Sequence, residues 1–190
     1  MKRIFILLGH TDKATLSGAF ADTYERVAQE AGHEVRRMNI GEMQFDPILH
    51  EGYKTIQQLE PDLKTFQENM RWCEHFVLLY PTWWSSMPAM LKGLFDRAWL
   101  PAFAFRFAHH GLTWSKLLKG RTAHIITSAN TPPWLLWFMY GPPTVVPELA
   151  LMRFAGIRAK STVFGPSERA SKTRVAHWFR KIERLARKGN

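Results

Sequence analysis

The chain has 190 residues, of which 46% are hydrophobic and 22% are charged, and its formal net charge is +10. This balance is typical of a folded protein and excludes a disordered chain, so we expect one domain over residues 1–190. A single cysteine, Cys73, excludes an intrachain disulfide and a cysteine-based metal cluster, which favours a reducing, intracellular compartment.

Strand and helix patterns alternate along the whole chain. Residues 2–8 contain four consecutive large apolar residues, which is typical of a parallel strand buried on both faces. The spacing of Phe20, Tyr24 and Val27 predicts a helix over residues 17–31. The later elements are predicted as strands at 33–40, 75–80, 122–128 and 157–164, helices at 63–73, 88–100, 144–155 and 170–188, and irregular segments at 41–53, 101–120 and 130–143.

Five strands that alternate with helices indicate an α/β fold, with a parallel sheet covered on both faces. We expect the flavodoxin-like three-layer sandwich, with strand order 2-1-3-4-5. In such sheets the ligand lies beyond the carboxyl ends of the strands, where the order reverses between strands one and three. The loops at residues 9–17 and 81–87 follow those two strands, so they are the predicted site.

The first of these loops has no G-x-G-x-x-G or Walker pattern, which argues against a nicotinamide-type Rossmann site or a nucleoside triphosphatase. Its hydroxyls at Thr11, Thr15 and Ser17 precede the start of a helix. Free N–H groups and the positive end of the helix dipole favour a phosphate there. The alternative is that Thr15 or Ser17 is simply an N-cap.

The second loop contains two adjacent tryptophans, Trp83 and Trp84, after a buried strand. Exposed indoles are costly in water unless a flat ligand or a partner covers them. We expect one of the two to pack under the following helix and the other to lie against a planar cofactor, a flavin.

This region resembles a known family. The segment PTWWSSMPAMLKGLFDRAWLPAFAF is similar to the signature of the flavodoxin-like NAD(P)H:quinone oxidoreductases, which include DT-diaphorase and bacterial modulators of drug activity. The first strand and GHTDKATLSGA extend the similarity. The matching residues are Pro81, Trp84, Pro88, Ala89, Leu91, Lys92, Gly93, Asp96, Arg97, Phe103, Ala104 and Phe105.

The resemblance implies roles for particular residues. Tyr140 matches a tyrosine that donates a hydrogen bond near the flavin ring, and it is the catalytic candidate. Phe105 and Phe107 match aromatic residues of the substrate pocket, which often come from the second subunit of a dimer. The implied cofactor-binding residues are His10, Thr15, Leu16 and Ser17 for the phosphate and ribityl chain, and Pro81, Thr82, Trp83, Trp84, Ser85, Thr127, Ser128, Ala129 and Asn130 for the ring.

The chain departs from the family pattern in three places. Ala129-Asn130 replaces a glycine pair, and Pro101 replaces a glycine near the aromatic segment. The long carboxyl-terminal extension of animal DT-diaphorase, part of which binds the adenosine half of FAD, is also missing. We therefore expect FMN as the cofactor, with FAD as the alternative.

Residues 132–143 form an unusual segment, because seven large apolar residues and a glycine lie between two proline pairs. A run this short predicts one or two helical turns, or a lid. It is interpreted as a buried dimer interface, a lid that places Trp134 on an apolar substrate, or a contact with the bilayer surface.

The remaining candidates have ordinary interpretations. Cys73 is expected to be buried, and His109-His110 is expected to be a loop and not a metal site. Asp96 and Arg97 are expected to form a surface pair or to anchor a loop. The basic residues near the end of the chain are expected to form a solvated helix face, and no motif indicates a nucleic-acid partner.

Together these features predict a flavin-dependent NAD(P)H oxidoreductase. NAD(P)H would pass a hydride to flavin N5 and leave, and a quinone or similar aromatic acceptor would then take it up in the same pocket, in a ping-pong reaction. We expect a cytoplasmic homodimer. The alternatives are a flavodoxin-type electron carrier, a class that is usually acidic, and a flavin-binding regulatory subunit of a membrane transporter, peripheral to the inner face of the membrane.

Overall fold

A central parallel sheet organises the molecule, which a computed structural model describes at residues 1–108 and 113–190. The strand order is β2-β1-β3-β6-β7, and all four neighbouring pairs are parallel. The predicted order 2-1-3-4-5 is therefore confirmed, with β6 and β7 as the fourth and fifth strands. The strands are β1 (Arg3–Leu8), β2 (Glu34–Asn39), β3 (His75–Pro81), β6 (Thr122–Ser128) and β7 (Arg158–Phe164).

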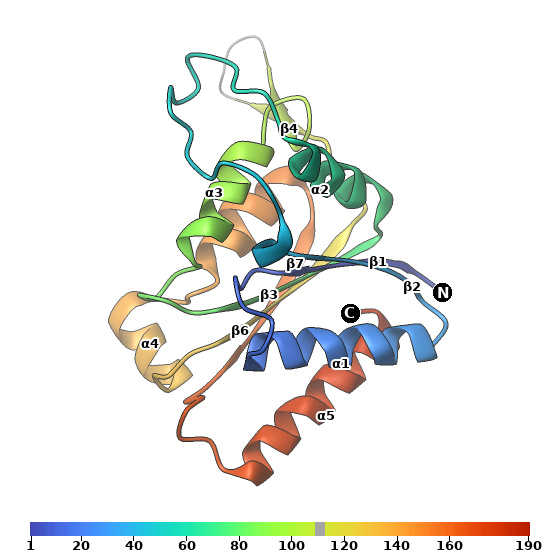
Figure 1. Cartoon of the computed structure of the whole chain (residues 1–190), viewed down its shortest axis with the longest axis vertical. Helices are drawn as coiled ribbons and strands as arrows, with labels where there is room; N and C mark the ends of the chain where they lie inside the picture. Colours follow the sequence, from blue (N-terminus) through green and yellow to red (C-terminus); the bar gives the residue numbers. More distant parts are fainter. Residues whose placement is uncertain (109–112) are drawn as a thin grey trace.

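Helices cover both faces of this sheet. Figure 1 shows α1 (Leu16–Glu30) and α5 (Lys172–Lys188) below the sheet, and α2 (Pro61–Trp72) and α3 (Ala89–Ala98) above it. A wider, π-type helix, η2 (Val146–Arg153), joins the upper layer where an ordinary helix is predicted. The three-layer α/β sandwich is thus confirmed.

Strands β1 and β3 are buried on both sides, as their unbroken apolar runs predict. In β1, Ile4 and Ile6 pack toward α1 and α5, whereas Phe5 and Leu7 pack toward α2 and α3. All four side chains are fully buried. Because these two cores lock β1 from both faces, the carboxyl edge of the sheet is a rigid base for the loops that follow the strands.

Two segments that the sequence analysis treats as irregular contain regular structure. Within residues 101–120, β4 (Phe105–Phe107) and β5 (Trp114–Lys116) form an antiparallel hairpin. The hairpin is held on the end of η2, where the Trp114 ring stacks on Phe154 at 4.5 Å and its indole N–H donates to the Phe154 carbonyl at 2.9 Å. His109 and His110 lie outside the described residues.

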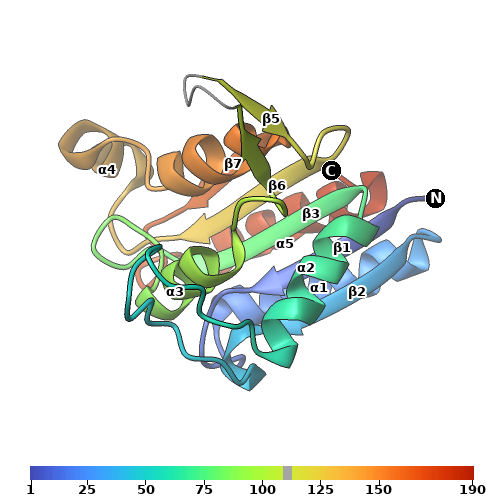
Figure 2. The same ribbon diagram turned by 90° about the horizontal axis from the view of Figure 1, so that it is seen from above.

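The second such segment, 130–143, contains helix α4 (Pro133–Tyr140), which agrees with the prediction of one or two helical turns. Figure 2 shows α4 at one end of the molecule, away from the middle of the sheet. A single 3-10 turn, η1 (Ile40–Glu42), follows β2. Within the described ranges, none of the helices combines the length and apolar character needed to span a bilayer.

Candidate functional site

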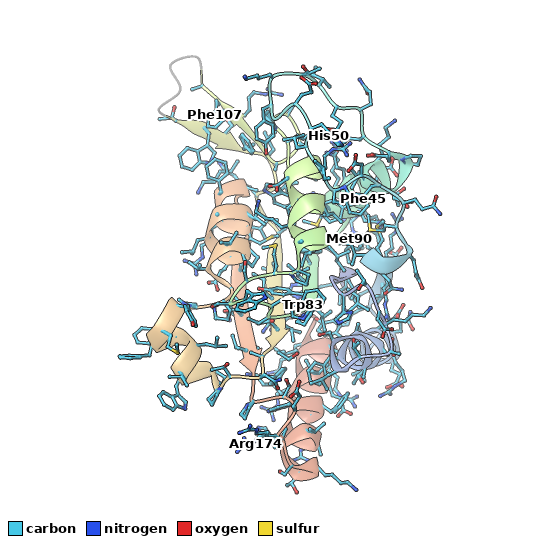
Figure 3. All side chains as sticks on the ribbon, turned by 60° about the vertical axis from the view of Figure 1, so that its left-hand side comes forward. Phe45, His50, Trp83, Met90, Phe107 and Arg174 are labelled. Atoms are coloured by element: carbon cyan, nitrogen blue, oxygen red, sulfur yellow. The ribbon has the colours of Figure 1, made fainter. Side chains whose placement is uncertain are left out.

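The loops that follow β1 and β3 meet at the carboxyl edge of the sheet, where the strand order reverses. The Gly9 N–H donates to the Leu79 carbonyl at 2.7 Å, which joins the two loops at their bases. Farther out, the ring of Trp83, which is labelled in Figure 3, lies edge to face with the ring of His10, and their centroids are 5.5 Å apart. The two loops of the predicted site therefore contact each other.

The start of α1 is suited to an anion. Thr15 is the N-cap, and its hydroxyl accepts from the Gly18 N–H at 3.3 Å. No acidic side chain lies in the first helical turn, and within the described part of the chain the N–H groups of Leu16 and Ser17 have no acceptor. The positive end of the helix dipole is thus left uncompensated. Lys13 turns away from this site, because its ammonium pairs with Glu42 at 2.7 Å.

The loop before α1 is held tightly in shape. The Asp12 N–H donates to His10 Nδ1 at 2.9 Å, and the Ala14 N–H donates to the Asp12 carboxylate at 2.8 Å. A side chain at Gly18 would place its Cβ only 1.9 Å from the Lys13 carbonyl oxygen. Glycine is therefore needed where the loop crosses the first turn of the helix.

The loop after β3 contains a strained two-residue turn. Trp83 and Ser86 exchange two backbone hydrogen bonds of 2.9 Å each, and the central residues Trp84 and Ser85 have φ of +50° and +59°. Such turns favour glycine or asparagine, because a side chain crowds the backbone at positive φ. The Ser85 hydroxyl is also buried without a partner in the described part of the chain. Strain and an unpaired polar atom at one place are features of functional sites.

One prediction about the two tryptophans is wrong. Neither indole packs under α3, because Trp83 is 46% exposed and Trp84 is fully exposed. The physical reason is the two-residue turn, which projects the Trp84 side chain outward. Trp83 is the indole that contacts the loop after β1, through His10.

The second loop is also joined by hydrogen bonds to the end of β6, where the third loop begins. The Thr82 N–H donates to the Ser128 carbonyl at 2.8 Å, and the Thr82 and Thr127 hydroxyls lie 2.8 Å apart. Thr127 is buried, so it supports the site from below and is not at the surface. The position of the turn at Trp84 and Ser85 is thus fixed by β6 as well as by β3.

A cavity of about 350 Å³ opens between these loops and α4. It brings together six of the predicted site residues, and it includes two residues that the sequence analysis missed, Thr131 and Leu136. Leu136 lies in an apolar run that gave no sign of which side chain turns inward. The lining residues are Thr82, Trp84, Ser85, Ala129, Asn130, Thr131, Leu136 and Tyr140.

Comparison with known proteins agrees with this geometry. A family model described as "Flavodoxin-like fold" matches residues 2–175. The chain belongs to this family. The resemblance to NAD(P)H:quinone oxidoreductases is confirmed by a guinea-pig (Cavia porcellus) relative, NAD(P)H dehydrogenase [quinone] 1, which is 26% identical over 129 residues. That match covers 57% of this chain and 46% of the relative, so the chain spans about half the length of such curated relatives.

Two solved structures share the fold of this flavodoxin-like protein over nearly its whole length. The NAD(P)H:quinone oxidoreductase from Methanothermobacter marburgensis aligns with a TM-score of 0.81 at 19% identity, covering 98% of each chain. The FMN-dependent NADH-azoreductase from Bacillus anthracis, solved in complex with FMN, aligns with a TM-score of 0.73 at 18% identity, covering 100% of each chain. At these identities the likeness establishes the fold alone.

Helix α4 of this flavodoxin-like protein is tied to the sheet at the site. The buried Tyr80 hydroxyl donates to the Pro143 carbonyl at 3.2 Å, just beyond the end of the helix. Burial raises the pKa of Tyr80 above its usual range, so this phenol is a fixed donor. Tyr140, the catalytic candidate, ends α4 at the cavity, and it is largely exposed.

The predicted substrate residues lie elsewhere in the chain. Phe105 and Phe107 line a different cavity of about 460 Å³, together with Tyr53, Trp99 and Phe154. Trp134 lies on the exposed part of α4 and does not line the cavity that contains Tyr140. A substrate role for these three residues remains a prediction.

Asp96 and Arg97 have different roles. Asp96 forms an exposed ion pair with Lys92 at 2.6 Å. Arg97 is buried and anchors the long loop before α2, because its guanidinium donates to the Glu60 carboxylate at 2.9 Å and to the Gln58 carbonyl at 2.8 Å. Cys73 is buried as predicted, and desolvation raises the pKa of its thiol to about 12, which makes it unreactive.

Proposed function

We propose that this chain is a flavin-dependent NAD(P)H oxidoreductase whose acceptor is a quinone or a similar flat aromatic compound. The observation that carries the proposal is the cavity beside the strained turn at Trp84-Ser85, in a loop whose Trp83 ring contacts His10, ahead of a helix start with free N–H groups. The relatives' names support the same class of reaction. Bound flavin would supply the electron-transfer chemistry between NAD(P)H and the acceptor.

The residues present fit the phosphate end of a flavin mononucleotide. The N–H groups of Leu16 and Ser17 would donate to phosphate oxygens, with the Thr15 hydroxyl beside them. His10 is held against this loop, where its Nδ1 accepts from the Asp12 N–H. We propose FMN in preference to FAD, and the likeness to an azoreductase solved with FMN supports that choice.

The residues at the other end fit an aromatic ring with polar edges. The Ser85 hydroxyl is buried at the cavity and has an unused donor and acceptor, so a ring carbonyl or ring nitrogen would satisfy it. The Trp84 indole offers a flat face, and the Tyr140 hydroxyl offers a donor on the α4 side. These side chains would bind and orient the ring, and Leu136 would exclude water from it.

We also propose a homodimer. Phe105 and Phe107 line a cavity separate from the one that holds Tyr140 in the same chain. A second copy would be needed to bring these aromatic rings over the first copy's ring site. The half-exposed Phe107 side chain supports this arrangement, because an exposed aromatic ring on a hairpin suits an interface.

A direct test begins with the absorbance spectrum of the purified protein before and after addition of FMN and, separately, FAD. Cofactor released by heating would be identified by chromatography. NAD(P)H oxidation would then be followed with a water-soluble quinone. Protein that stays colourless, takes up neither flavin and oxidises no NAD(P)H would refute the proposal.

The role of Tyr140 is tested in the same assay. Tyr140→Phe should retain flavin but lose about tenfold in turnover, because the phenol donor is absent when charge develops on the ring. Trp137→Phe is the matched control, since Trp137 lies on the same helix and does not line the cavity. Equal rates for the two variants would remove Tyr140 from the catalytic site.

A further inference from the structure

Helix α4 exposes an apolar surface, of which the proposed ring site uses only Tyr140. Trp137 is 65% exposed, Phe138 is 78% exposed and Met139 is 53% exposed, and Trp134 and Tyr140 are similarly open. Leu136 is the one buried residue of the helix. The helix contains no charged side chain and projects at the end of the molecule (Figures 1 and 2). We call residues Trp134, Trp137, Phe138, Met139 and Tyr140 the α4 patch.

Exposing apolar side chains to water is unfavourable in free energy, and patches of this kind usually have a binding partner. Its composition is that of an interfacial anchor, since Trp and Tyr suit the boundary between lipid headgroups and acyl chains. Its eight residues form a helix about 12 Å long, which is too short to cross a bilayer and long enough to lie in its surface.

Basic residues lie around the start of α5, after a segment that contacts the loop leading into α4. The segment that leads into α5 contacts the loop that leads into α4, because the Ser167 N–H donates to the Ala129 carbonyl at 2.9 Å and the Glu168 N–H donates to the Asn130 side chain at 3.0 Å. Figure 3 shows Arg174 near the start of α5, on the same side of the molecule as α4. The exposed cations of this region are Arg169, Lys172 and Arg174.

We propose that the α4 patch docks on an anionic lipid bilayer, with Arg169, Lys172 and Arg174 facing the lipid headgroups. Charge complementarity selects this partner over a second copy of the chain. A contact between two such faces would bring two sets of cations together within proteins of net charge +10, which costs free energy. An anionic surface satisfies the cations and the apolar side chains at once.

The same helix borders the cavity. Leu136 and Tyr140 line it, whereas Trp137, Phe138 and Met139 project away from its lining. Docking would therefore hold the cavity near the lipid surface. If the proposed function holds, this placement assigns the acceptor to the class of quinones that carry an apolar chain and dissolve in the bilayer.

The docking is tested with the full chain and two kinds of vesicle, one of phosphatidylcholine alone and one that also contains phosphatidylglycerol. Binding is measured by co-sedimentation and by the shift of tryptophan fluorescence. We expect strong binding to the anionic vesicles, weak binding to the neutral ones, and loss of binding as salt is raised. Binding of neither vesicle at low salt would overturn the proposal.

Two sets of variants separate the apolar and charged contributions. Trp137→Ser with Phe138→Ser should weaken partitioning by about tenfold or more, because two interfacial aromatic anchors are lost. The matched control is Ile48→Ser with Ile56→Ser, two exposed apolar residues of the loop before α2.

Replacing Arg169, Lys172 and Arg174 by glutamine should weaken binding to anionic vesicles by about fivefold per residue at low salt. The same charge change at Lys54, Lys64 and Lys119 is the control. Equal losses in both sets of charge variants would show that net charge, and not this face, binds the lipid. Dimers that dissociate in the Trp137→Ser, Phe138→Ser variant would instead assign the patch to a second copy.

The acceptor is tested with Trp137→Ser, Phe138→Ser loaded with flavin. It should reduce a water-soluble quinone at the wild-type rate, and reduce a long-chain quinone in anionic vesicles about tenfold more slowly. Equal rates for both variant and wild type with the vesicle-borne quinone would overturn this assignment. Vesicle binding needs no flavin, so failure of the proposed function would leave the docking result intact, and the two failures are distinguishable.

Discussion

Replacing Ser85 by glycine should stabilise the fold while it weakens flavin binding. Ser85 has φ of +59°, and its buried hydroxyl has no partner in the described part of the chain. A side chain at such a φ costs about 1–2 kcal/mol, so glycine relieves that strain. About 0.4–1 kcal/mol of this gain is offset, because glycine makes the unfolded chain more flexible. Removing an unpaired buried hydroxyl relieves roughly 1 kcal/mol more. We expect the free energy of unfolding to rise by about 1–2 kcal/mol.

Two other variants separate these contributions. Ala102 has φ of +66° on an exposed turn outside the cavity, so Ala102→Gly should raise the free energy of unfolding by at most about 1 kcal/mol and leave flavin binding unchanged. Ser85→Ala keeps the strained backbone and removes only the hydroxyl. It should gain roughly 1 kcal/mol of stability and lose about as much flavin affinity as Ser85→Gly.

The free energy of unfolding is measured by urea denaturation of flavin-free protein, with the slopes compared to confirm that the unfolded states match. Flavin affinity is measured by titration, and about tenfold weaker binding is expected for both Ser85 variants. A lower free energy of unfolding for Ser85→Gly beside a higher one for Ala102→Gly would refute the argument that strain is stored at Ser85.

Arg97→Leu should lower the free energy of unfolding by about 3–5 kcal/mol, because it leaves the Glu60 carboxylate and nearby carbonyls without their donor. Lys92→Ala, which removes an exposed pair, should cost less than about 1 kcal/mol, and similar losses for the two variants would contradict the anchoring role of Arg97. Gly18→Ala should weaken flavin binding by about tenfold or more, because its Cβ would meet the Lys13 carbonyl. An unchanged flavin titration would place the phosphate elsewhere. Acid should destabilise the protein below about pH 6.5, because burial lowers the pKa of His75 to about 3 and of His124 to about 4. The folded state then binds fewer protons than the unfolded state. The free energy of unfolding is therefore highest above the pKa of histidine in the unfolded chain, and it falls by roughly 2 kcal/mol per histidine between pH 7 and pH 5. His124→Gln should make the free energy of unfolding depend less on pH, as measured by urea denaturation at several pH values. An unchanged pH dependence would contradict this prediction.

Several features were missed because they depend on contacts that are not local. The hairpin of β4 and β5 has three residues in each strand, which is too short for a repeating apolar pattern, and its position depends on the stacking of Trp114 against Phe154. The outward direction of Trp84 follows from a two-residue turn that its sequence, Trp-Ser, does not favour. Thr131 and Leu136 join the site only because α4 and the loop before it lie against the turn at Trp84 and Ser85 across the cavity.

The sequence by itself determined the layers of this protein. Unbroken apolar runs in β1 and β3 demand burial on both faces, and the alternation of strands with helices leads to a parallel sheet and its switch point. The tertiary structure alone decided which side chains meet there. The backbone hydrogen bond from Thr82 to Ser128 at the end of β6, and the Tyr80 bond to Pro143, set the cavity and leave the α4 patch exposed. Local patterns determine which residues are buried, whereas the directions of loop side chains depend on partners far away in the chain.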